Sequence, residues 1–530
     1  MRLLKSCLIF IILISYPEDS VCQSDYFNKR YNLCQDYEDE AWSGADGILQ
    51  LSDGYALFGF TVDTTYYWRR QIPILKIDNQ GNPVLFRSYG NTFVDYYTGW
   101  AGGYLQVSNY NEFYIAGSIN YWQPDNYDVG LLMKLDLSLD TLWTKEYNLN
   151  LDSIPDTSML FNQMDICSNN DLIFGGYMNG SYMLLMRTDS AGNELWHKLF
   201  HYGSYTLCTG YSVIQTTDGG FALGGFMYTI GQPETGNPVI IKTDSAGNQE
   251  WVQFMGGPLL DDAAFLARSG DGNIIMGSTY GDIMAGNEAL NRINIAKLDN
   301  DGEVLWDKKY GISKHYNDLL NIRVLEDGKI IAWGYCPVDF PHYSGWILKV
   351  NENGDSLWYR EYDYLIGPES RNWLRDVIET TDHSLIACGD IFPKLPDTGN
   401  RDAWVIKLDS IGCAYEGCDT TVGIKDDDKN VRLYDVDKSN LDIWPNPASG
   451  IVDCRLPIVD LRGDWTLMIY DIFGREVLAP YTPSPAMGEG RGGGWQGWRL
   501  DVSALPTGIY FISILQDGRR VKGGKFVVSR

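Results

Sequence analysis

The chain has 530 residues and a formal net charge of -27, and 44% of its residues are hydrophobic. This length excludes a single small module, and the acidic charge excludes nucleic acid or an anionic lipid surface as a general partner, because like charges repel. The 56 Gly, 35 Tyr and 17 Trp favour turn-rich β structure over long helices.

Residues 1–22 have the pattern of a secretory signal peptide. Arg2 and Lys5 form a basic start, and the apolar run over residues 7–15 is too short to cross a bilayer as a helix. Ser20 and Cys22 supply a small-residue cleavage site. A lipid anchor at Cys22 is the weaker alternative, because an apolar approach to the cysteine is missing. No later run is long and apolar enough for a membrane helix, so we expect an exported mature chain without a transmembrane segment.

The cysteines indicate an oxidising compartment in which disulfides persist. Of the 10 cysteines, two lie in the signal peptide. Cys413 and Cys418 are close enough in sequence for a local disulfide, and we predict this pair. The spacing of the remaining six leaves their pairing open, and several fit buried thiols: Cys34, Cys167, Cys208, Cys336, Cys388 and Cys454.

Residues 23–418 contain seven copies of a phrase of the type KLDxxGxxxW, which recurs roughly every 55 residues, a period typical of propellers and solenoids. Each copy combines short apolar runs with Gly, Asn and Asp turns and has no helical periodicity. We therefore predict an all-β fold, a seven-bladed β-propeller with four antiparallel strands per blade. The anchor residues of the phrase are Asp78, Asp136, Asp189, Asp244, Asp299, Asn351 and Asp409.

The order of strands within a repeat predicts how the ring closes. We expect an opening strand such as that at Trp306, a second at Tyr211, a third at Phe221, and then the phrase strand. The seventh copy ends at Gly412 without the Trp-type strand, and YFNKRYN from Tyr26 resembles the missing strand. We expect this N-terminal strand to complete the last blade, which removes an open sheet edge.

The phrase resembles the repeat of quinoprotein-like propellers, in which a Trp that follows an Asp-Gly turn docks between blades. Five copies match this pattern, and we expect their Trp to pack between blades: Trp143, Trp196, Trp251, Trp306 and Trp358. The resemblance implies adjacent cysteines in members that carry the quinone cofactor. This chain has no Cys-Cys pair, so we predict no cofactor and do not favour a quinone-dependent dehydrogenase.

Two further positions recur in all seven copies. A basic residue stands two positions before each anchor, and we expect it to pair with that anchor on the same strand: Lys76, Lys134, Arg187, Lys242, Lys297, Lys349 and Lys407. A glycine closes each third strand, and we attribute it to a close backbone approach or a β-bulge: Gly59, Gly117, Gly175, Gly225, Gly277, Gly334 and Gly389.

The loops after the third strands vary in length and are rich in aromatic residues. In a four-stranded meander they lie at one end, and the tight Asp-Gly turns lie at the other, so we predict a ligand face at the loop end. Aromatic platforms beside carboxylates suit glycans or peptide segments, whereas aromatics that only cover loops are the plainer interpretation. The candidate residues are Tyr67, Trp68, Arg69, Tyr121, Trp122, Asp125, Phe340, His342 and Tyr343.

Catalytic and metal motifs are not found in the sequence. There is no GxSxG, HExxH or GxxxxGK motif. His197 and His201 have the spacing of a helical metal pair but fall on a predicted strand and its loop, so we predict no metal and no catalytic residue. We expect a binding or scaffold module for glycan or protein ligands. The alternative is a secreted enzyme acting on polysaccharide, a hydrolase or lyase, with carboxylates near the channel.

Residues 419–440 are polar and acidic and are predicted to be a linker, and residues 441–530 have the strand pattern of a small β-sandwich of the Ig-like type. Separated motifs in this tail resemble the C-terminal sorting domain of type IX secretion substrates: Pro445, Asn446, Pro447, Asp471, Gly474, Arg475, Leu505, Pro506, Gly508, Tyr510 and Lys525. The resemblance implies recognition by the translocon, removal of the tail by a sorting protease, and release or attachment at the outer cell surface. An adhesive sandwich domain is the alternative, and a glycine-rich insertion between Glu476 and Trp498 departs from the pattern.

Overall fold

The computed structural model describes residues 26–34, 42–63, 69–90, 94–98, 105–107, 112–121, 127–149, 158–203, 205–229, 232–257, 259, 261–283, 289–311, 317–337, 342–365, 370–392, 401–414, 442–444, 448–458, 465–471, 477, 481–484, 494–516 and 519–529. Every element in these ranges is a β-strand, and none is a helix with the length and hydropathy that a membrane crossing requires. The chain divides into two compact units, Met1–Asp426 and Asp427–Arg530, with the boundary inside the predicted linker.

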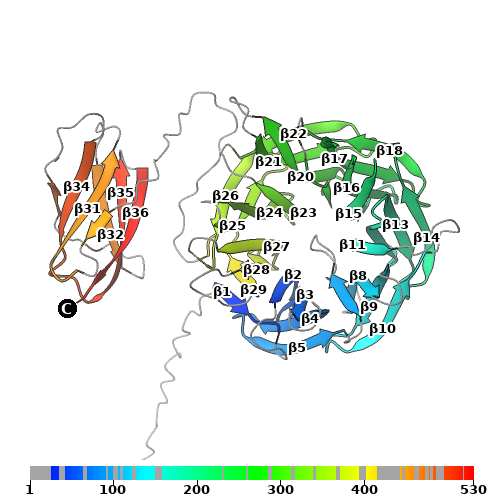
Figure 1. Ribbon diagram of the computed structural model, residues 1–530, viewed down its shortest axis with the longest axis horizontal. Coiled ribbons are helices and arrows are strands. Elements are labelled where there is room, and N and C mark those ends of the chain that lie inside the picture. Colours follow the sequence, from blue (N-terminus) through cyan, green and yellow to red (C-terminus); the bar gives the residue numbers. More distant parts are fainter. Residues whose placement is uncertain are drawn as a thin grey trace, which may run out of the picture. The chain divides into compact units, whose positions relative to one another are not determined.

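The described part of the first unit consists of repeated four-stranded antiparallel sheets that resemble propeller blades (Figure 1). The first sheet contains β2 (Trp42–Leu51), β3 (Gly54–Asp63), β4 (Arg69–Asp78) and β5 (Pro83–Tyr89). The second contains β6 (Asp95–Thr98) and β7 (Leu105–Val107), which both pair with β8 (Phe113–Tyr121), then β9 (Tyr127–Leu135) and β10 (Thr141–Tyr147). The third contains β11 (Met159–Ile166), β12 (Leu172–Met178), β13 (Tyr182–Thr188) and β14 (Glu194–Phe200).

The pattern continues through the rest of the unit. The fourth sheet contains β15 (Leu207–Gln215), β16 (Phe221–Thr229), β17 (Gln232–Thr243) and β18 (Gln249–Phe254). The fifth contains β19 (Phe265–Arg268), β20 (Ile274–Ile283), β21 (Ala289–Leu298) and β22 (Val304–Tyr310). The sixth contains β23 (Asp318–Val324), β24 (Ile330–Pro337), β25 (Tyr343–Val350) and β26 (Ser356–Tyr362). The seventh contains β27 (Arg371–Glu379), β28 (Leu385–Phe392), β29 (Asp402–Leu408) and β1 (Phe27–Tyr31), and a single parallel bridge between β25 and β27 joins it to the sixth.

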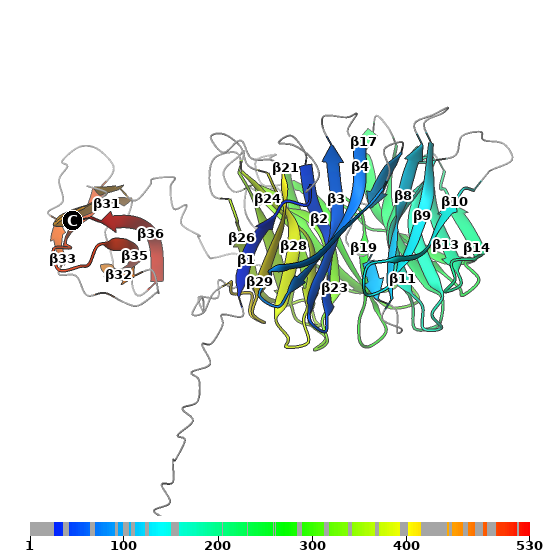
Figure 2. The ribbon, with the colours of Figure 1, turned by 90° about the horizontal axis from the view of Figure 1, so that it is seen from below.

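The sheets lie around a common centre and pack face to face. Figure 1 shows β2, β11, β15, β23 and β27 nearest the centre and β5, β10, β14, β18, β22 and β26 outermost, and Figure 2 shows the sheets from the side. Apolar side chains point from both faces of a sheet, so each core lies between two consecutive sheets. One core joins Ile386 and Val405 of the seventh sheet to Ile48 and Leu57 of the first, all of them buried.

The strand that carries the repeat's Trp ends its own sheet. β22, with Trp306, pairs with β21 and is the last strand of the fifth sheet. The prediction that this strand opens the next unit was wrong by one strand, because sequence periodicity fixes the spacing of strands but not the gap between sheets. The tight turns and variable connections still alternate between the two ends of each sheet, as predicted.

The N-terminal strand completes the seventh sheet, which confirms the predicted pairing. β1 runs antiparallel to β29, with Phe27 opposite Lys407 and Tyr31 opposite Ala403. The edge that β29 would otherwise expose is therefore covered by a strand from the other end of the unit.

The outer strands contact the phrase turn of the following sheet, and we call these contacts the clasp, which in β22 involves three side chains. In β22, Trp306 packs against Gly354, where an added Cβ atom would lie 2.9 Å from the ring. The Lys308 ammonium bonds to the Asp355 carboxylate at 2.7 Å, and the Tyr310 hydroxyl donates to the Gly354 carbonyl at 2.5 Å. The predicted packing of the repeat's Trp between sheets is thereby confirmed, since Trp143, Trp196, Trp251 and Trp358 meet Gly192, Gly247, Gly302 and Gly412 in the same way.

β1 makes the clasp with Phe in place of Trp. An added Cβ atom at Gly81 of the first sheet would lie 2.9 Å from the Phe27 ring. The Lys29 ammonium bonds to the Asn82 side-chain oxygen at 2.9 Å, and the Tyr31 hydroxyl donates to the Gly81 carbonyl at 2.8 Å. The contact from the seventh sheet to the first thus repeats the contact between the fifth and the sixth.

The anchor residue of the phrase closes its own turn. One Asp244 carboxylate oxygen accepts the backbone N–H groups of Ala246 and Asn248 at 2.9 and 2.8 Å. The side-chain amide of Asn248 donates to the other oxygen at 2.9 Å and, with these backbone bonds, lowers the pKa of Asp244. The third residue after the anchor has a positive φ, 78° at Gly247, and Leu139 takes this conformation in the second sheet with φ 64°.

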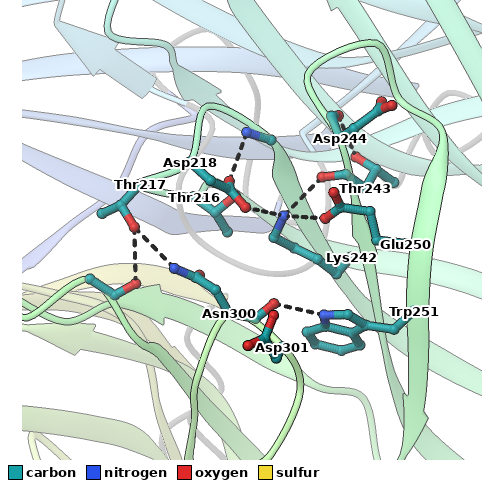
Figure 3. A network of polar contacts seen from close by, with 12 residues as sticks. Thr216, Thr217, Asp218, Lys242, Thr243, Asp244, Glu250, Trp251, Asn300 and Asp301 are labelled. Carbon is teal, nitrogen blue, oxygen red and sulfur yellow. Dashed lines mark hydrogen bonds and ion pairs between the residues drawn. The ribbon is translucent and has the colours of Figure 1, made fainter.

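The basic residue before the anchor pairs elsewhere, so the predicted same-strand pair was wrong. Lys242 is fully buried and bonds at 2.7 Å to both Asp218 and Glu250, as Figure 3 shows. Asp218 lies in the turn between the first two strands of that sheet, and Lys297 reaches Asp271 of the equivalent turn at 2.6 Å. The anchor is not available to this lysine because its oxygens already accept the backbone of their own turn.

The recurring glycine of the second strand in each sheet marks a close backbone approach, as predicted. A Cβ atom there would lie 1.8 to 2.2 Å from a carbonyl oxygen of the first strand at Gly59, Gly117, Gly176, Gly225, Gly334 and Gly389. In the third sheet the residue is Gly176, next to the predicted Gly175, and in the fifth sheet Gly277 meets only the side chains of Ile322 and Leu319. The paired strand carries a register shift beside five of these glycines, which leaves one bulged residue each: Asp46, Asn162, Tyr211, Leu320 and Arg375.

The cysteines of the described residues are buried. Cys167, Cys208, Cys336, Cys388 and Cys454 are thiols, and burial raises the pKa of Cys167 and Cys336 to about 12. Cys413 is disulfide-bonded. Cys418 lies outside the described residues, so the pair stays a prediction.

The second unit has two sheets that share one core. One contains β30 (Asp442–Trp444), β31 (Ile451–Ile458), β34 (Gly494–Asp501) and β33 (Tyr481–Ser484), and the other contains β32 (Trp465–Asp471), β35 (Gly508–Gln516) and β36 (Arg519–Val528). Val452 and Leu500 of the first sheet are buried together with Ile469 and Ile512 of the second. This arrangement gives the two layers that the strand pattern predicts.

Candidate functional site

Six side chains gather at the loop end of the sixth and seventh sheets, and we call them the arginine–aromatic cluster. They are Tyr335, Tyr343, Arg371, Trp373, Arg375 and Arg401. Each lies at or near the strand ends opposite the tight Asp-Gly turns. Tyr335, Tyr343, Arg371 and Trp373 are half-buried, so they reach solvent while resting on other side chains.

Backbone geometry positions the cluster. Arg371 and Trp373 are two residues apart on β27, so they share a face. Tyr343 stands beside Arg371 because these two residues form a parallel bridge between β25 and β27. Arg375 is the bulged residue of β27, and Gly389 makes the bulge fit, since a Cβ atom at Gly389 would lie 1.8 Å from the Trp373 carbonyl oxygen.

The guanidinium groups rest on aromatic faces. Arg371 lies 5.5 Å from the ring centre of Tyr343 and 5.9 Å from that of Trp373. Arg375 and Arg401 lie 5.2 and 5.3 Å from the Trp373 ring centre. Such contacts are worth about 0.5–2 kcal/mol each, more when water is excluded.

One buried carboxylate holds two of these arginines. Asp390 of β28 accepts from Arg375 Nε at 2.9 Å and from Arg401 Nε at 2.8 Å. Burial raises the pKa of Asp390, but Arg401 and then Arg375 outweigh it, so the net shift is downward. Asp390 therefore stays charged and fixes both guanidinium planes.

Asp46 of the first sheet lies close to this ion pair. It is buried, accepts a hydrogen bond from the Thr98 hydroxyl at 2.6 Å, and is the bulged residue of β2. Burial raises its pKa to about 6, and the nearby Arg375 offsets only part of this rise. Asp46 therefore takes up a proton at a higher pH than an ordinary aspartate does.

Two further carboxyl groups, on neighbouring sheets, repel one another electrostatically when both are charged. Asp262 precedes β19 in the fifth sheet, and its pKa is raised to about 6 by desolvation, with a smaller contribution from Asp318. Asp318 begins β23 in the sixth sheet, and burial raises its pKa although Tyr335 and Asn291 donate hydrogen bonds to it. Tyr335 connects this pair to the cluster, because its ring centre lies 5.1 Å from that of Trp373.

The structure places the predicted ligand residues in two separate groups. Tyr121, at the end of β8, stacks on Tyr127 with ring centres 5.3 Å apart and donates to Glu146 at 2.8 Å. His342 Nδ1 lies 2.6 Å from the Ser370 hydroxyl, and only its neighbour Tyr343 belongs to the cluster. Arg69 begins β4, and its side chain is not among those described. Tyr67, Trp68, Trp122, Asp125 and Phe340 lie outside the described residues.

The sequence predictions missed the centre of the cluster. The predicted ligand residues come from long loops. The central residues of the cluster lie instead on or beside strands: Arg371, Trp373, Arg375 and Arg401. One signal was available, because Arg375 occupies the bulged position that Asp46 has in the first sheet. Where equivalent positions of a repeat carry different types of side chain, the position indicates a site that is unique to one sheet.

The sorting motif is partly described. In the second unit the Tyr510 hydroxyl donates to the Pro506 carbonyl at 2.8 Å, Leu505 is buried and Gly508 begins β35. Asp471 lies opposite Tyr510 on β32, and Lys525 lies on β36. Pro445, Asn446, Pro447, Gly474 and Arg475 lie outside the described residues. Among the side chains that the structure describes, no group of three or more His, Cys, Asp or Glu could hold a metal ion.

Residues 442–529 match the family model of the secretion system C-terminal sorting domain. This chain carries a type IX sorting domain. It is therefore handled by the type IX secretion machinery and is secreted or attached to the outer cell surface. The match covers the sorting domain alone and leaves the sheets of the first unit without a family.

Comparison with solved structures finds distant likenesses. A protein of unknown function from Dyadobacter fermentans has a TM-score of 0.37 at 8% identity, covering 59% of this chain and 95% of that one. A Penicillium chrysogenum alpha-L-arabinanase complexed with arabinobiose has a TM-score of 0.36 at 10% identity, covering 58% and 92%. Bacillus subtilis levansucrase has a TM-score of 0.27 at 8% identity, covering 64% and 89%. These scores carry no argument, and comparison with curated protein sequences finds no match.

Proposed function

We propose that the protein is a glycan-binding propeller, exported by type IX secretion, whose seven sheets close into a ring and whose ligand binds at the arginine–aromatic cluster. The signal peptide directs export, residues 419–440 link the ring to the sorting domain, and a sorting protease removes the tail. The observation that carries the binding proposal is Trp373, a half-buried ring among three guanidinium groups with an indole N–H that lacks an acceptor.

Ring closure is supported by the contacts between the last and first sheets. β1 covers the edge of β29, its clasp reaches Gly81 of the first sheet, and an apolar core joins the two sheets. An open array would leave this apolar surface in water, at roughly 25 cal/mol per Å².

A sugar fits the chemistry of the cluster better than an apolar ligand. The ring faces of Trp373, Tyr335 and Tyr343 offer apolar area, and the arginines beside them offer hydrogen-bond donors and no acceptors. Sugars combine apolar C–H faces with oxygen acceptors, so both kinds of surface find partners.

Glycan-array screening of the full-length mature protein tests this proposal. We expect at least one oligosaccharide hit and a loss of affinity of tenfold or more in Trp373→Ala. Phe254→Ala is the control, because Phe254 is an exposed aromatic residue that stacks on Tyr205 on the fourth sheet. An array without hits, or hits that bind Trp373→Ala as they bind the unmodified protein, would show that the proposal is wrong.

Hydrolysis of the bound glycan is a second candidate, favoured by the raised pKa values of Asp262 and Asp318 on neighbouring sheets. A carboxyl group kept protonated beside a second carboxyl group is the arrangement that glycosidases use as general acid and base or nucleophile. Release of reducing sugar from an array hit, abolished in both Asp262→Asn and Asp318→Asn, would support it. Intact recovery of every hit after prolonged incubation would exclude it.

A further inference from the structure

Arg371 makes no ion pair with any carboxylate that the structure describes, whereas Arg375 and Arg401 both pair with Asp390. The Nε–H of Arg371 is buried and has no acceptor among the described residues. The group is held by three rings, those of Tyr343, Trp373 and Phe392, at 5.5 to 5.9 Å from the ring centres. Aromatic faces position a guanidinium group but supply no hydrogen-bond acceptor in its plane.

A second donor beside it also lacks an acceptor. The indole Nε1–H of Trp373 is buried and unbonded, two residues along the same face of β27. A buried donor without a partner costs about 1–3 kcal/mol, and this penalty is removed when an acceptor arrives. Both donors belong to residues on one face of β27, and each lacks an acceptor among the described residues.

The charge around these donors is positive, although the whole chain carries -27. Among the described residues, Arg375 and Arg401 share the single carboxylate of Asp390, and Asp46 lies near Arg375 rather than beside Arg371. An anion that reaches the cluster therefore meets unsatisfied positive charge. A planar guanidinium group binds the two oxygens of a carboxylate with parallel hydrogen bonds.

We infer that the ligand is an acidic glycan, whose sugar carboxylate binds Arg371 Nε–H and Trp373 Nε1–H. This inference rests on the proposed glycan binding and names its substrate class: polysaccharides built from uronic acids. The sugar ring lies against the neighbouring aromatic faces, and Asp390 keeps Arg375 and Arg401 from competing for the carboxylate. The ligand thus supplies the hydrogen-bond acceptor that these two donors lack within the described part of the protein.

Calorimetric titration of the full-length mature protein tests the inference. One probe is an oligogalacturonate, and its matched control is the methyl ester of the same oligosaccharide, which keeps the sugar and removes the charge. We expect the acid to bind at least tenfold more tightly than the ester, and this preference to shrink as salt rises. Arg371→Gln should remove the preference, so that acid and ester bind with similar affinity.

Two control variants keep the result interpretable. Arg87→Gln removes an exposed arginine of β5 and should alter nothing. Arg371→Lys keeps the charge but lacks the Nε–H, and we expect it to restore only part of the preference. Unchanged far-UV circular dichroism and melting temperature show that each variant is folded.

The outcomes separate the two proposals. Equal binding of acid and ester leaves glycan binding standing and overturns the carboxylate inference. Binding of neither overturns glycan binding and the inference together. A sulfated oligosaccharide that binds as tightly as the uronate would show that the site recognises any anion, which also contradicts the inference.

Discussion

Asp46 combines burial, a hydrogen bond from Thr98 and a nearby ion pair between Arg375 and Asp390. In the folded chain its pKa is raised to about 6 from an ordinary value of 3.8. The folded state therefore holds this proton more tightly than the unfolded state does. Its contribution to stability is complete below about pH 4 and is lost as the pH rises to about 6 and above, by up to roughly 3 kcal/mol.

Asp46→Asn should flatten this pH dependence. The amide cannot ionise, so the free energy of unfolding should fall less between pH 4 and pH 7 than in the unmodified chain, by about 1–3 kcal/mol. Urea denaturation at the two pH values measures the difference. Asp53→Asn, in an exposed turn, is the control and should keep the original dependence. If Asp46→Asn kept it too, Asp46 would be an ordinary carboxylate.

Gly302 carries two constraints, a φ of 88° and contact with the Trp251 ring 3.1 Å from an added Cβ atom. Gly302→Ala should lower the free energy of unfolding by about 1–3 kcal/mol. Gly219→Ala is the matched control, because Gly219 has a similar φ of 83° with nothing within 4 Å of its Cβ position. Thermal melts compare the two variants, and equal losses would show that the clasp adds nothing beyond backbone strain.

At the scale of residues, the sequence supports predictions wherever one residue type repeats. The Trp contacts follow from a position that recurs in five copies, and the glycine approaches from one that recurs in all seven. The ion pairs of Lys242 with Asp218 and Glu250 could not be predicted from the repeat, because the spacing of strands does not determine which neighbouring turn a side chain reaches. The arginine–aromatic cluster could not either, since Arg371 and Arg401 meet only through Trp373 and belong to no repeated pattern.

Among the elements, β1 has the largest consequence for its size. It is five residues long, covers the β29 edge and buries Tyr31. Deleting residues 23–32 after the signal peptide should lower the melting temperature by 10 °C or more and cause association, because the exposed edge of β29 pairs with other chains. Differential scanning calorimetry and size-exclusion chromatography measure both effects.

A synthetic peptide of residues 26–34 provides the control for this deletion. Added in excess, it should restore the melting temperature, whereas a peptide with Phe27→Ala and Tyr31→Ala should not. A truncated chain that melted like the intact one would show that β1 has no part in closing the sheet.

Strand existence was predictable because each apolar run ends at a Gly, Asn or Asp turn. The placement of β22 in the fifth sheet was not, because β22 is linked to both β21 and β23 in the chain and only pairing decides between them. The bulges could not be predicted either, because an extra residue such as Arg375 shifts the alternation of inward and outward side chains on β27 by only one position.

At the scale of the whole molecule, the sorting domain determines where the chain ends up. A chain that lacks residues 441–530 should accumulate in the periplasm and be absent from the medium and the outer surface, because the secretion machinery recognises this domain. Cell fractionation with immunoblotting measures the distribution. The intact chain is the control, and normal appearance of the truncated chain outside the cell would contradict an address in the tail.

The pairing of β1 with β29 also sets the order of events during biosynthesis. Synthesis makes Phe27–Tyr31 first, and the partner of this segment, Asp402–Leu408, emerges only after the six other sheets have been made. β1 therefore stays without its partner strand until nearly the whole first unit has been synthesised. The seventh sheet is therefore completed by the segment with which translation of the described chain began.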